Sequence, residues 1–210
     1  MRIVLLGPPG AGKGTQGQAL ANIYGVPHMA TGDIVRDHIA RHTEFGRKVE
    51  AAIAAGNFAP DQDIYYWVNR RLAEPDAQQG YILDGFPRDV AQAEMFTQAI
   101  DAVVDLEIAE SALVERLAGR MVCPVCGTVY NEQHHPPKQV GHCDKEGAAL
   151  VRRPDDEPDA VRHRLQVYRD QTAPLQAYYD RRGLLRRIDA SGSPADVTGR
   201  ICTALAKRVF

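Results

Sequence analysis

The chain has 210 residues, enough to bury one sizeable core with small inserts. Charged residues make up 25% and apolar residues 44%, which is ordinary for a globular protein. The formal net charge of −2 argues against a dedicated nucleic-acid binder, and no apolar run is long enough to predict a membrane span. The chain enters a strand at once without a signal-peptide pattern, and its cysteines suit a metal site. We therefore expect a cytoplasmic protein.

Apolar runs of strand length alternate with helical patterns along the chain. The predicted strands are 3–6, 28–30, 81–84, 103–108 and 184–188. The predicted helices are about 14–24, 32–41, 45–55, 62–73, 89–99 and 111–120, followed by a long helix that Pro158 opens and Pro174 kinks, and by a last helix from Ser193-Pro194 to near Phe210. Asp61 and Ser111 are the expected N-caps of two of them. This alternation predicts an α/β fold, a doubly wound five-stranded parallel sheet flanked by helices.

Two stretches break the alternation. Residues 31–59 carry two helical patterns with no strand, and residues 121–156 are rich in Pro, Gly, Cys and His without a helical period. Ligands of such sheets bind at the carboxyl ends of the strands. Both stretches are therefore predicted to be inserts that cover the ligand crevice.

The first strand runs into a glycine-rich loop that fits G-x-x-x-x-G-K-[ST] from Gly7 onward, except that one glycine separates the lysine from the threonine. A strand before the loop and a helix after it are the context that this motif needs. Backbone N–H groups of such a loop converge on phosphate oxygens, while the lysine reaches the outer phosphates and the threonine hydroxyl can bind Mg²⁺. The predicted phosphate-binding residues are Gly10, Ala11, Gly12, Lys13, Gly14 and Thr15.

Further motifs follow in a specific order. They are Thr31-Gly32-Asp33 with Arg36, Asp84-Gly85-Phe86-Pro87-Arg88 with Gln92, Gly119-Arg120, and Arg153-Pro154-Asp155-Asp156 leading to Arg164. With the phosphate loop, they resemble the adenylate kinase family, in the long form with an extended lid, over nearly the whole chain. The resemblance implies Mg²⁺-dependent phosphoryl transfer from ATP to AMP, giving two ADP, by a monomer. It also implies a core of 1–29, 60–120 and 157–210, an AMP-binding insert at 30–59 and a lid at 121–156.

Phosphoryl transfer requires in-line placement of two phosphate groups and compensation of their charge, without a general base. Arginine suits this task because its planar fork pairs two phosphate oxygens at once. The predicted catalytic residues are Lys13, Asp84, Arg88, Arg120, Arg153 and Arg164. Asp84 ends the third strand, and we assign it to Mg²⁺ through water with Asp33 as a helper. A turn or capping role is the alternative for both aspartates.

The resemblance also assigns nucleotide contacts. On the AMP side they are Thr31, Arg36, Asn57, Phe58, Ala59, Gly85, Phe86, Pro87, Arg88, Gln92, Arg153 and Arg164, with Gln92 reading the adenine edge. On the ATP side they are Arg116, Arg120, Val129, Tyr130 and Gly192. The alternatives are an ordinary exposed helix residue for Gln92, and a solvated basic stripe for Arg116 and Arg120, which lie four residues apart on one helix.

The lid carries a zinc-knuckle type of turn, Cys123-Pro124-Val125-Cys126-Gly127, and Cys143 follows after 16 residues. A structural zinc ion takes four ligands. Metal-binding family members place Cys or Asp where Glu146 stands, so the predicted ligands are Cys123, Cys126, Cys143 and Glu146. His134, His135 and His142 compete for the fourth position, and free thiols in a lid held by hydrogen bonds are the alternative. Cys202 is expected to be buried in the last helix.

Three other functions are weighed against this one. Kinases that phosphorylate UMP or CMP, or that use GTP as donor, are the nearest, but Gln92 with Thr31 favours AMP and the long lid disfavours the UMP/CMP type. A nucleotide-dependent switch would need ordered switch loops in place of the arginine set. A zinc-ribbon nucleic-acid binder would need a basic face.

Overall fold

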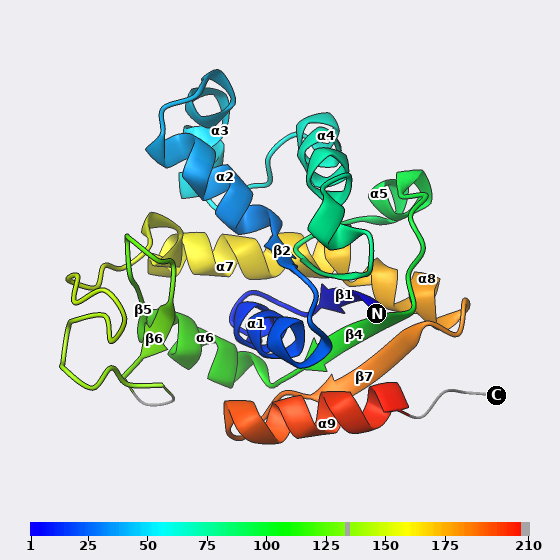
Figure 1. Ribbon diagram of the computed structural model, residues 1–210. Helices are drawn as coiled ribbons and strands as arrows, with labels where there is room; N and C mark the ends of the chain where they lie inside the picture. Colours follow the sequence, from blue (N-terminus) through cyan, green and yellow to red (C-terminus); the bar gives the residue numbers. More distant parts are fainter. Residues whose placement is uncertain (133–134, 207–210) are drawn as a thin grey trace.

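A five-stranded parallel sheet forms the centre of the molecule (Figure 1). The computed structural model describes residues 1–132 and 135–206. The strands are β1 (Arg2–Leu6), β2 (His28–Ala30), β3 (Tyr81–Asp84), β4 (Ala102–Glu107) and β7 (Leu185–Asp189), in the spatial order β2-β3-β1-β4-β7. Every pairing in this sheet is parallel. The predicted fold is confirmed, and each strand end lies within one residue of its predicted place.

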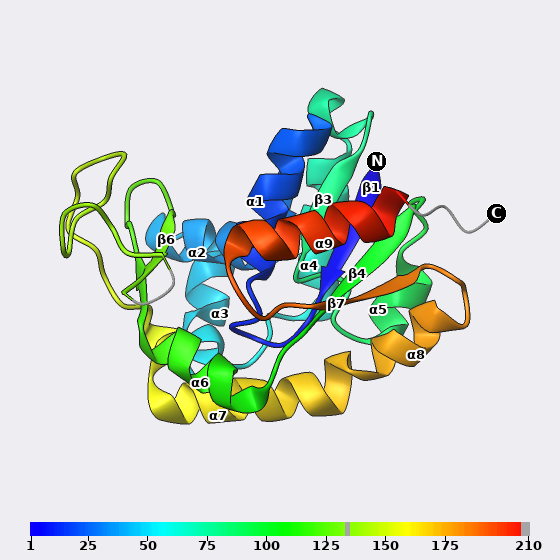
Figure 2. The same cartoon turned by 90° about the horizontal axis from the view of Figure 1, so that it is seen from below.

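Helices cover both faces of the sheet because its strands are apolar on both sides. In β1, Ile3 and Leu5 join the core under one face, whereas Val4 and Leu6 join the core under the other, as the two-residue period of a strand requires. The first face packs against α1 (Lys13–Tyr24), α6 (Glu110–Ala118) and α9 (Pro194–Ala206), and α9 crosses the sheet in Figure 2. The second packs against α4 (Asp61–Leu72), α5 (Val90–Met95) and α8 (Pro174–Asp180). None of the described helices is both long and apolar enough to cross a membrane.

The long helix predicted from Pro158 is divided in two. Helix α7 (Pro158–Val167) passes into a wider π-helical turn (Tyr168–Thr172), and α8 follows. Proline has no N–H to donate to the preceding turn, so the hydrogen-bond ladder must change before Pro174. The backbone N–H of Ala173 bonds to the carbonyl of Tyr168 instead, five residues back. The helix thus changes type over the residues before Pro174, where a kink was predicted.

Several predicted helix ends were wrong. Helix α5 stops at Met95 rather than 99, because Phe96 takes an extended conformation and its ring packs edge-on against Phe86. Asp61 is the first helical residue of α4, after Pro60, and Ser111 lies inside α6, which begins at Glu110. The predicted end of the last helix, near Phe210, falls outside the described residues.

The first insert is helical, as predicted, and projects above the sheet in Figure 1. It consists of α2 (Thr31–Ala40) and α3 (Glu44–Ala54), which pack against each other. Thr43 caps α3, because its hydroxyl accepts a hydrogen bond from the N–H of Gly46 at 3.0 Å. Short 3₁₀ turns lie at Pro75–Ala77 and Pro154–Asp156.

The lid contains a small antiparallel sheet that was not predicted. It pairs β5 (Arg120–Val122) with β6 (Val129–Asn131) at the side of the molecule, beside α6 (Figure 1). Strands of three residues are too short to show an alternating pattern in the sequence. Beside this sheet the lid has a separate small core, whose buried members among the described residues are Cys123, Tyr130, Cys143 and Leu150.

Two glycine substitutions test the packing of the insert. A Cβ atom on Gly46 would meet the His38 carbonyl oxygen at 2.1 Å, whereas nothing lies within 4 Å of one on Gly199 in α9. We expect Gly46→Ala to lower the free energy of unfolding by about 1–3 kcal/mol, and Gly199→Ala to raise it by up to about 1 kcal/mol. Urea denaturation measures both. Equal stabilities of Gly46→Ala and the wild type would show that α2 and α3 are not in this close contact.

Candidate functional site

The phosphate loop follows β1 and ends on α1, where glycines carry the turn. Gly7, Gly10 and Gly12 all have positive φ angles, of 132°, 86° and 100°. A side chain on Gly7 would also lie 2.8 Å from the Leu106 carbonyl oxygen. These positions therefore require glycine, which leaves the loop backbone free to curve around a ligand at the start of α1.

Lys13 begins α1 and turns back over the loop. Its Nζ atom donates hydrogen bonds to the carbonyl oxygens of Gly7 at 2.7 Å and Pro8 at 3.0 Å. Burial lowers the pKa of Lys13 to about 8, Asp84 opposes the shift, and nearby arginines including Arg164 add to it. The lysine is thus held in place by neutral partners, and a bound polyanion would stabilise its charge.

Asp84 ends β3 beside the first turn of α1. A Cβ on Gly14 would lie 3.9 Å from its Oδ2 atom. Burial raises the pKa of Asp84, but His28, whose Nε2 atom lies 3.8 Å from Oδ2, and the cations Lys13 and Arg88 outweigh that effect and leave the pKa below its ordinary value. The carboxylate therefore stays ionised next to the phosphate loop, as a Mg²⁺ position requires.

Two aspartates anchor the arginines at the far side of the site. The guanidinium of Arg120 forms a two-pronged ion pair with Asp156, whose side chain is fully buried. Arg164 bonds to Asp155 at 2.8 Å and to Asp156 at 3.3 Å. Asp155 and Asp156 were recognised in the sequence only as part of a motif. Their role in holding Arg120 and Arg164 was missed, because a lone sequence shows no partner across 36 residues.

Three other arginines of the predicted set carry less compensated charge. Arg88 donates to the Gly85 carbonyl at 2.7 Å and lies over the ring of Phe58, 4.1 Å from its centroid. Burial, reinforced by neighbouring arginines, lowers the pKa of both Arg88 and Arg153 to about 10. The buried Nε atom of Arg153 has no hydrogen-bond partner among the described residues, and Arg36 pairs with the exposed Asp33. Positive charge is concentrated here without a matching number of carboxylates, which favours a polyanionic ligand.

The end of β3 and the start of the insert are joined by buried hydrogen bonds. Thr31 is almost fully buried, and its hydroxyl donates to the carbonyls of Gly85 at 2.9 Å and Asp84 at 3.3 Å. Gln92, also buried, accepts from the backbone N–H of Arg88 at 2.8 Å. Hydrogen bonds therefore link four of the predicted AMP contacts to one another, namely Thr31, Gly85, Arg88 and Gln92.

The remaining predicted contacts divide into those near the loop and those in the lid. Arg116 reaches the carbonyl of Ala190 at 3.0 Å and that of Ala11, in the loop, at 3.5 Å. Gly192 lies exposed in the turn after β7 with a φ of 86°. By contrast, the Tyr130 side chain points into the lid core, where its hydroxyl accepts from the backbone N–H of Asp144 at 2.9 Å, whereas Val129 is only partly buried.

The lid holds two turns of the same form. The Cys123 N–H bonds to the Thr128 carbonyl at 3.0 Å, and the Gly127 N–H returns to the Cys123 carbonyl at 3.0 Å. The second turn repeats both bonds between Cys143 and residues 147–148, at 2.8 and 2.9 Å. Cys126 and Glu146 therefore occupy equivalent positions, each three residues after the first cysteine of its turn.

The sulfur atoms of Cys123, Cys126 and Cys143 lie within 4.8 Å of one another. This arrangement suits a metal ion, although the Glu146 carboxylate is not part of the cluster among the described residues and is exposed. Of the competing histidines, His135 stacks on the Tyr130 ring, His142 contacts the Val140 carbonyl, and His134 lies outside the described residues. Cys202 is half-buried rather than fully buried in α9.

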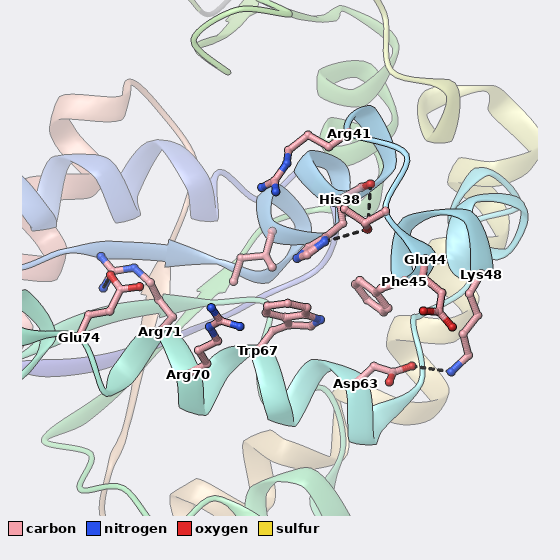
Figure 3. Close-up of a pocket in the computed structure, with 12 residues that line it drawn as sticks. His38, Arg41, Glu44, Phe45, Lys48, Asp63, Trp67, Arg70, Arg71 and Glu74 are labelled. Atoms are coloured by element: carbon pink, nitrogen blue, oxygen red, sulfur yellow. Dashed lines mark hydrogen bonds and ion pairs between the residues drawn. The ribbon is translucent and has the colours of Figure 1, made fainter.

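A separate hollow of about 700 Å³ lies between the insert and α4 (Figure 3). The His38 ring lies 4.2 Å from that of Trp67, and Lys48 Nζ lies 2.9 Å from Asp63 Oδ2 across the hollow. None of the predicted site residues lines it. One of the cations that line it, Arg71, is already paired with Asp76 at 2.7 Å and Glu74 at 3.1 Å. The hollow thus lies at the contact between the insert and the core, and it is distinct from the phosphate site.

Comparison with known proteins fits this geometry. The family model described as adenylate kinase matches residues 5–184. A protein from Anaeromyxobacter sp. (strain Fw109-5), named adenylate kinase, is 46% identical over the whole chain and 99% of its own length. Proteins of that name from Moorella thermoacetica and Thermodesulfovibrio yellowstonii are 46% and 41% identical, each over 99% of this chain and at least 99% of their own.

The chain belongs to the adenylate kinase family. The predicted activity is thereby confirmed: it is a nucleoside monophosphate kinase that transfers a phosphoryl group reversibly from ATP to AMP, giving two ADP, with Mg²⁺ accompanying the ATP. The rival kinases of UMP or CMP, the nucleotide switch and the zinc-ribbon binder are set aside by the family match.

The lowered pKa of Lys13 predicts a pH dependence. In the free enzyme the protonated, phosphate-binding form is lost as the pH rises through about 8. We therefore expect kcat/KM for MgATP to fall above that pH, whereas kcat should stay level to higher pH because bound phosphates raise the pKa of Lys13 again. Initial rates between about pH 6.5 and 9.5 measure this.

The control is Lys13→Arg, which stays charged throughout this range and should lose the alkaline fall in kcat/KM, whatever its absolute activity. A wild-type kcat/KM that is level over the whole range would contradict the assignment.

Proposed function

We propose that the two substrates of this adenylate kinase meet over Lys13, between the phosphate loop and the facing arginines. The observation that supports this is electrostatic: Arg88, Arg120 and Arg164 all lie close enough to Lys13 to lower its pKa. Four mutually repelling cations placed so close together favour the binding of two negatively charged phosphate groups. The loop, residues 10–15, binds the outer phosphates of ATP.

The AMP phosphate is the nucleophile, and it is already an anion. We assign its binding to Arg36, Arg88 and Arg153, and assign Arg120 and Arg164 to the phosphoryl group in transfer. These side chains orient the two phosphates in line and stabilise the charge that develops on the transferred oxygens. Thr31 and residues 57–59 and 85–87 form the wall around AMP, while Arg116, the backbone of 129–130 and Gly192 border the ATP side.

Asp84 is the proposed protein group behind Mg²⁺, through water, with Thr15 on the loop side. The ionised state of Asp84 and its place beside Gly14 fit this role. When bound, the metal neutralises charge on the ATP phosphates. Asp33 is the weaker candidate, because its carboxylate already pairs with Arg36.

The three parts expected from the sequence serve this chemistry. Core segments 1–29, 60–120 and 157–210 hold the phosphate site, while the insert 30–59 and the lid 121–156 close over AMP and ATP. Closure excludes water, so that ATP is not hydrolysed in place of transfer. A monomeric, cytoplasmic enzyme without nucleic-acid or membrane partners remains our expectation.

Arg88 and Arg120 give different outcomes when replaced by alanine. Both variants should lose roughly 10³-fold or more in kcat, because each removes a cation from one of the two reacting phosphate groups. Arg88→Ala should melt near the wild type, since the Arg88 side chain contacts a carbonyl and a ring and forms no ion pair among the described residues. Arg120→Ala should also lose about 2–3 kcal/mol of stability, since it leaves the buried Asp156 with only the longer bond to Arg164. Steady-state kinetics and thermal denaturation measure the two effects.

Arg162→Ala is the matched control, because Arg162 lies exposed on α7 and its one ion pair in the described part of the chain is with the exposed Asp159. It should change neither turnover nor melting temperature. Near-normal turnover of Arg88→Ala or Arg120→Ala would show that the assigned role is wrong.

We propose that the lid binds one structural Zn²⁺, or a similar divalent ion, through Cys123, Cys126, Cys143 and Glu146. The three thiols already converge, and Glu146 holds the position on its turn that Cys126 holds on the other. A carboxylate is an acceptable fourth zinc ligand, and four protein ligands leave no open position for chemistry. The ion would stabilise a lid whose own core is too small.

Metal analysis tests the lid site. Glu146→Ala should weaken metal retention, and Glu146→Cys should strengthen it, because thiolate suits zinc better than carboxylate does. Removal of the metal should clearly lower the melting temperature, whereas turnover at moderate temperature should change less. His142→Ala is the control and should keep its metal; loss of metal in that variant would move the fourth ligand to His142. A wild type purified without chelator and empty of metal would refute the site.

A further inference from the structure

The side-chain amide of Gln92 is held from both ends. Its Nε2 atom donates to Asp61 Oδ1 at 2.6 Å, and its Oε1 atom accepts from the backbone N–H of Arg88 at 2.8 Å. The backbone N–H of Gln92 is itself bonded to Asp89 Oδ1 at 2.7 Å, at the start of α5. Gln92 is only 3% exposed, so few other orientations are open to it.

The chemistry of the two partners permits one orientation of this amide. A carboxylate can only accept a hydrogen bond, and a backbone N–H can only donate one. If the amide were turned over, its oxygen would face the Asp61 oxygen and its NH₂ would face the Arg88 N–H. Both hydrogen bonds would be replaced by repulsive contacts, so Asp61 and Arg88 together fix the amide.

The fixed amide has one donor and one acceptor left for a ligand: the second hydrogen of Nε2 and the second lone pair of Oε1. Adenine presents the matching pair, an N6 amino donor next to the N1 acceptor. Hypoxanthine and guanine present the reverse, an O6 acceptor next to an N1–H donor, and these would match only the turned amide. A site that leaves buried polar groups unpaired rejects such an analogue strongly.

We propose that Asp61 is a specificity-determining positioning residue, which selects adenine over 6-oxopurines by holding the Gln92 amide in its adenine-reading orientation. The inference rests on the proposed contact of Gln92 with the AMP base. Asp61 acts through Gln92, from the first residue of α4, and needs no contact of its own with the nucleotide.

The test compares AMP with inosine monophosphate, which differs only at positions 1 and 6 of the base. The new side-chain amide in Asp61→Asn can accept or donate, so the turned Gln92 amide keeps one of its two partners in that variant. We expect the ratio of kcat/KM for AMP to kcat/KM for inosine monophosphate to fall by about 10-fold or more in Asp61→Asn. The kcat with AMP should stay within about threefold of the wild type, because no group at the phosphates changes. Both substrates are measured on one preparation, so partial unfolding of a variant cancels from the ratio.

Asp63→Asn is the matched control. Asp63 lies on the same first turn of α4, but its carboxylate pairs with Lys48 rather than with Gln92, so the ratio should not change. Gln92→Ala distinguishes the role of Asp61 from that of Gln92. If Gln92→Ala lowers the ratio and Asp61→Asn does not, the role of Asp61 is refuted while that of Gln92 stands. If neither variant lowers it, the proposed contact of Gln92 with adenine fails as well.

Discussion

Repulsion between cations is the constraint that shapes this enzyme. Lys13, Arg88, Arg120 and Arg164 must stand close together before any phosphate arrives, and the fold holds them there with few counter-charges. Carbonyl groups hold Lys13 and Arg88, which leaves their full charge for the ligand. Of these four, only Arg120 and Arg164 form ion pairs with buried carboxylates of the described residues, those of Asp155 and Asp156. The site is thus preorganised for phosphate charge, and little reorganisation is left for the moment of transfer.

The insert is attached to the rest of the enzyme by contacts of different kinds. Its root is buried, where Thr31 bonds to the end of β3. Near its end, Asn57 shares an exposed hydrogen bond with His163 of α7 at 2.7 Å. Toward α4 it makes the exposed Lys48–Asp63 pair and apolar contacts, because Val35 and Val49 share a buried core with α4. Exposed polar contacts of this kind contribute little stability and open easily. Movement of the insert, which the proposed closure over AMP requires, would therefore have to separate the apolar contacts with α4 as well as these polar pairs.

The parts that sequence could predict are those fixed by local pattern. The strand–loop–helix around Lys13 and the apolar strands were correct because hydrophobic runs and glycine positions carry them. The short lid strands left no periodic signal. Asp61 was misjudged because a helix-capping preference is local, whereas its bond to Gln92 spans 31 residues. The same holds for Asp156 and Arg120: which acidic residue neutralises which arginine depends on the folded contacts, and one sequence does not contain that information.

One short segment links the insert to the residues proposed to recognise AMP. Phe58 lies under the Arg88 guanidinium, Ala59 is buried in the core, and Pro60 precedes Asp61, which holds Gln92. This segment at the end of the insert is thus also the wall proposed around AMP. A base that fails to satisfy the Gln92 amide would leave buried polar groups unpaired beside it. If the insert closes over AMP as proposed, closure over the wrong nucleotide would cost free energy there, so that acceptor selection and closure of the insert would depend on the same few residues.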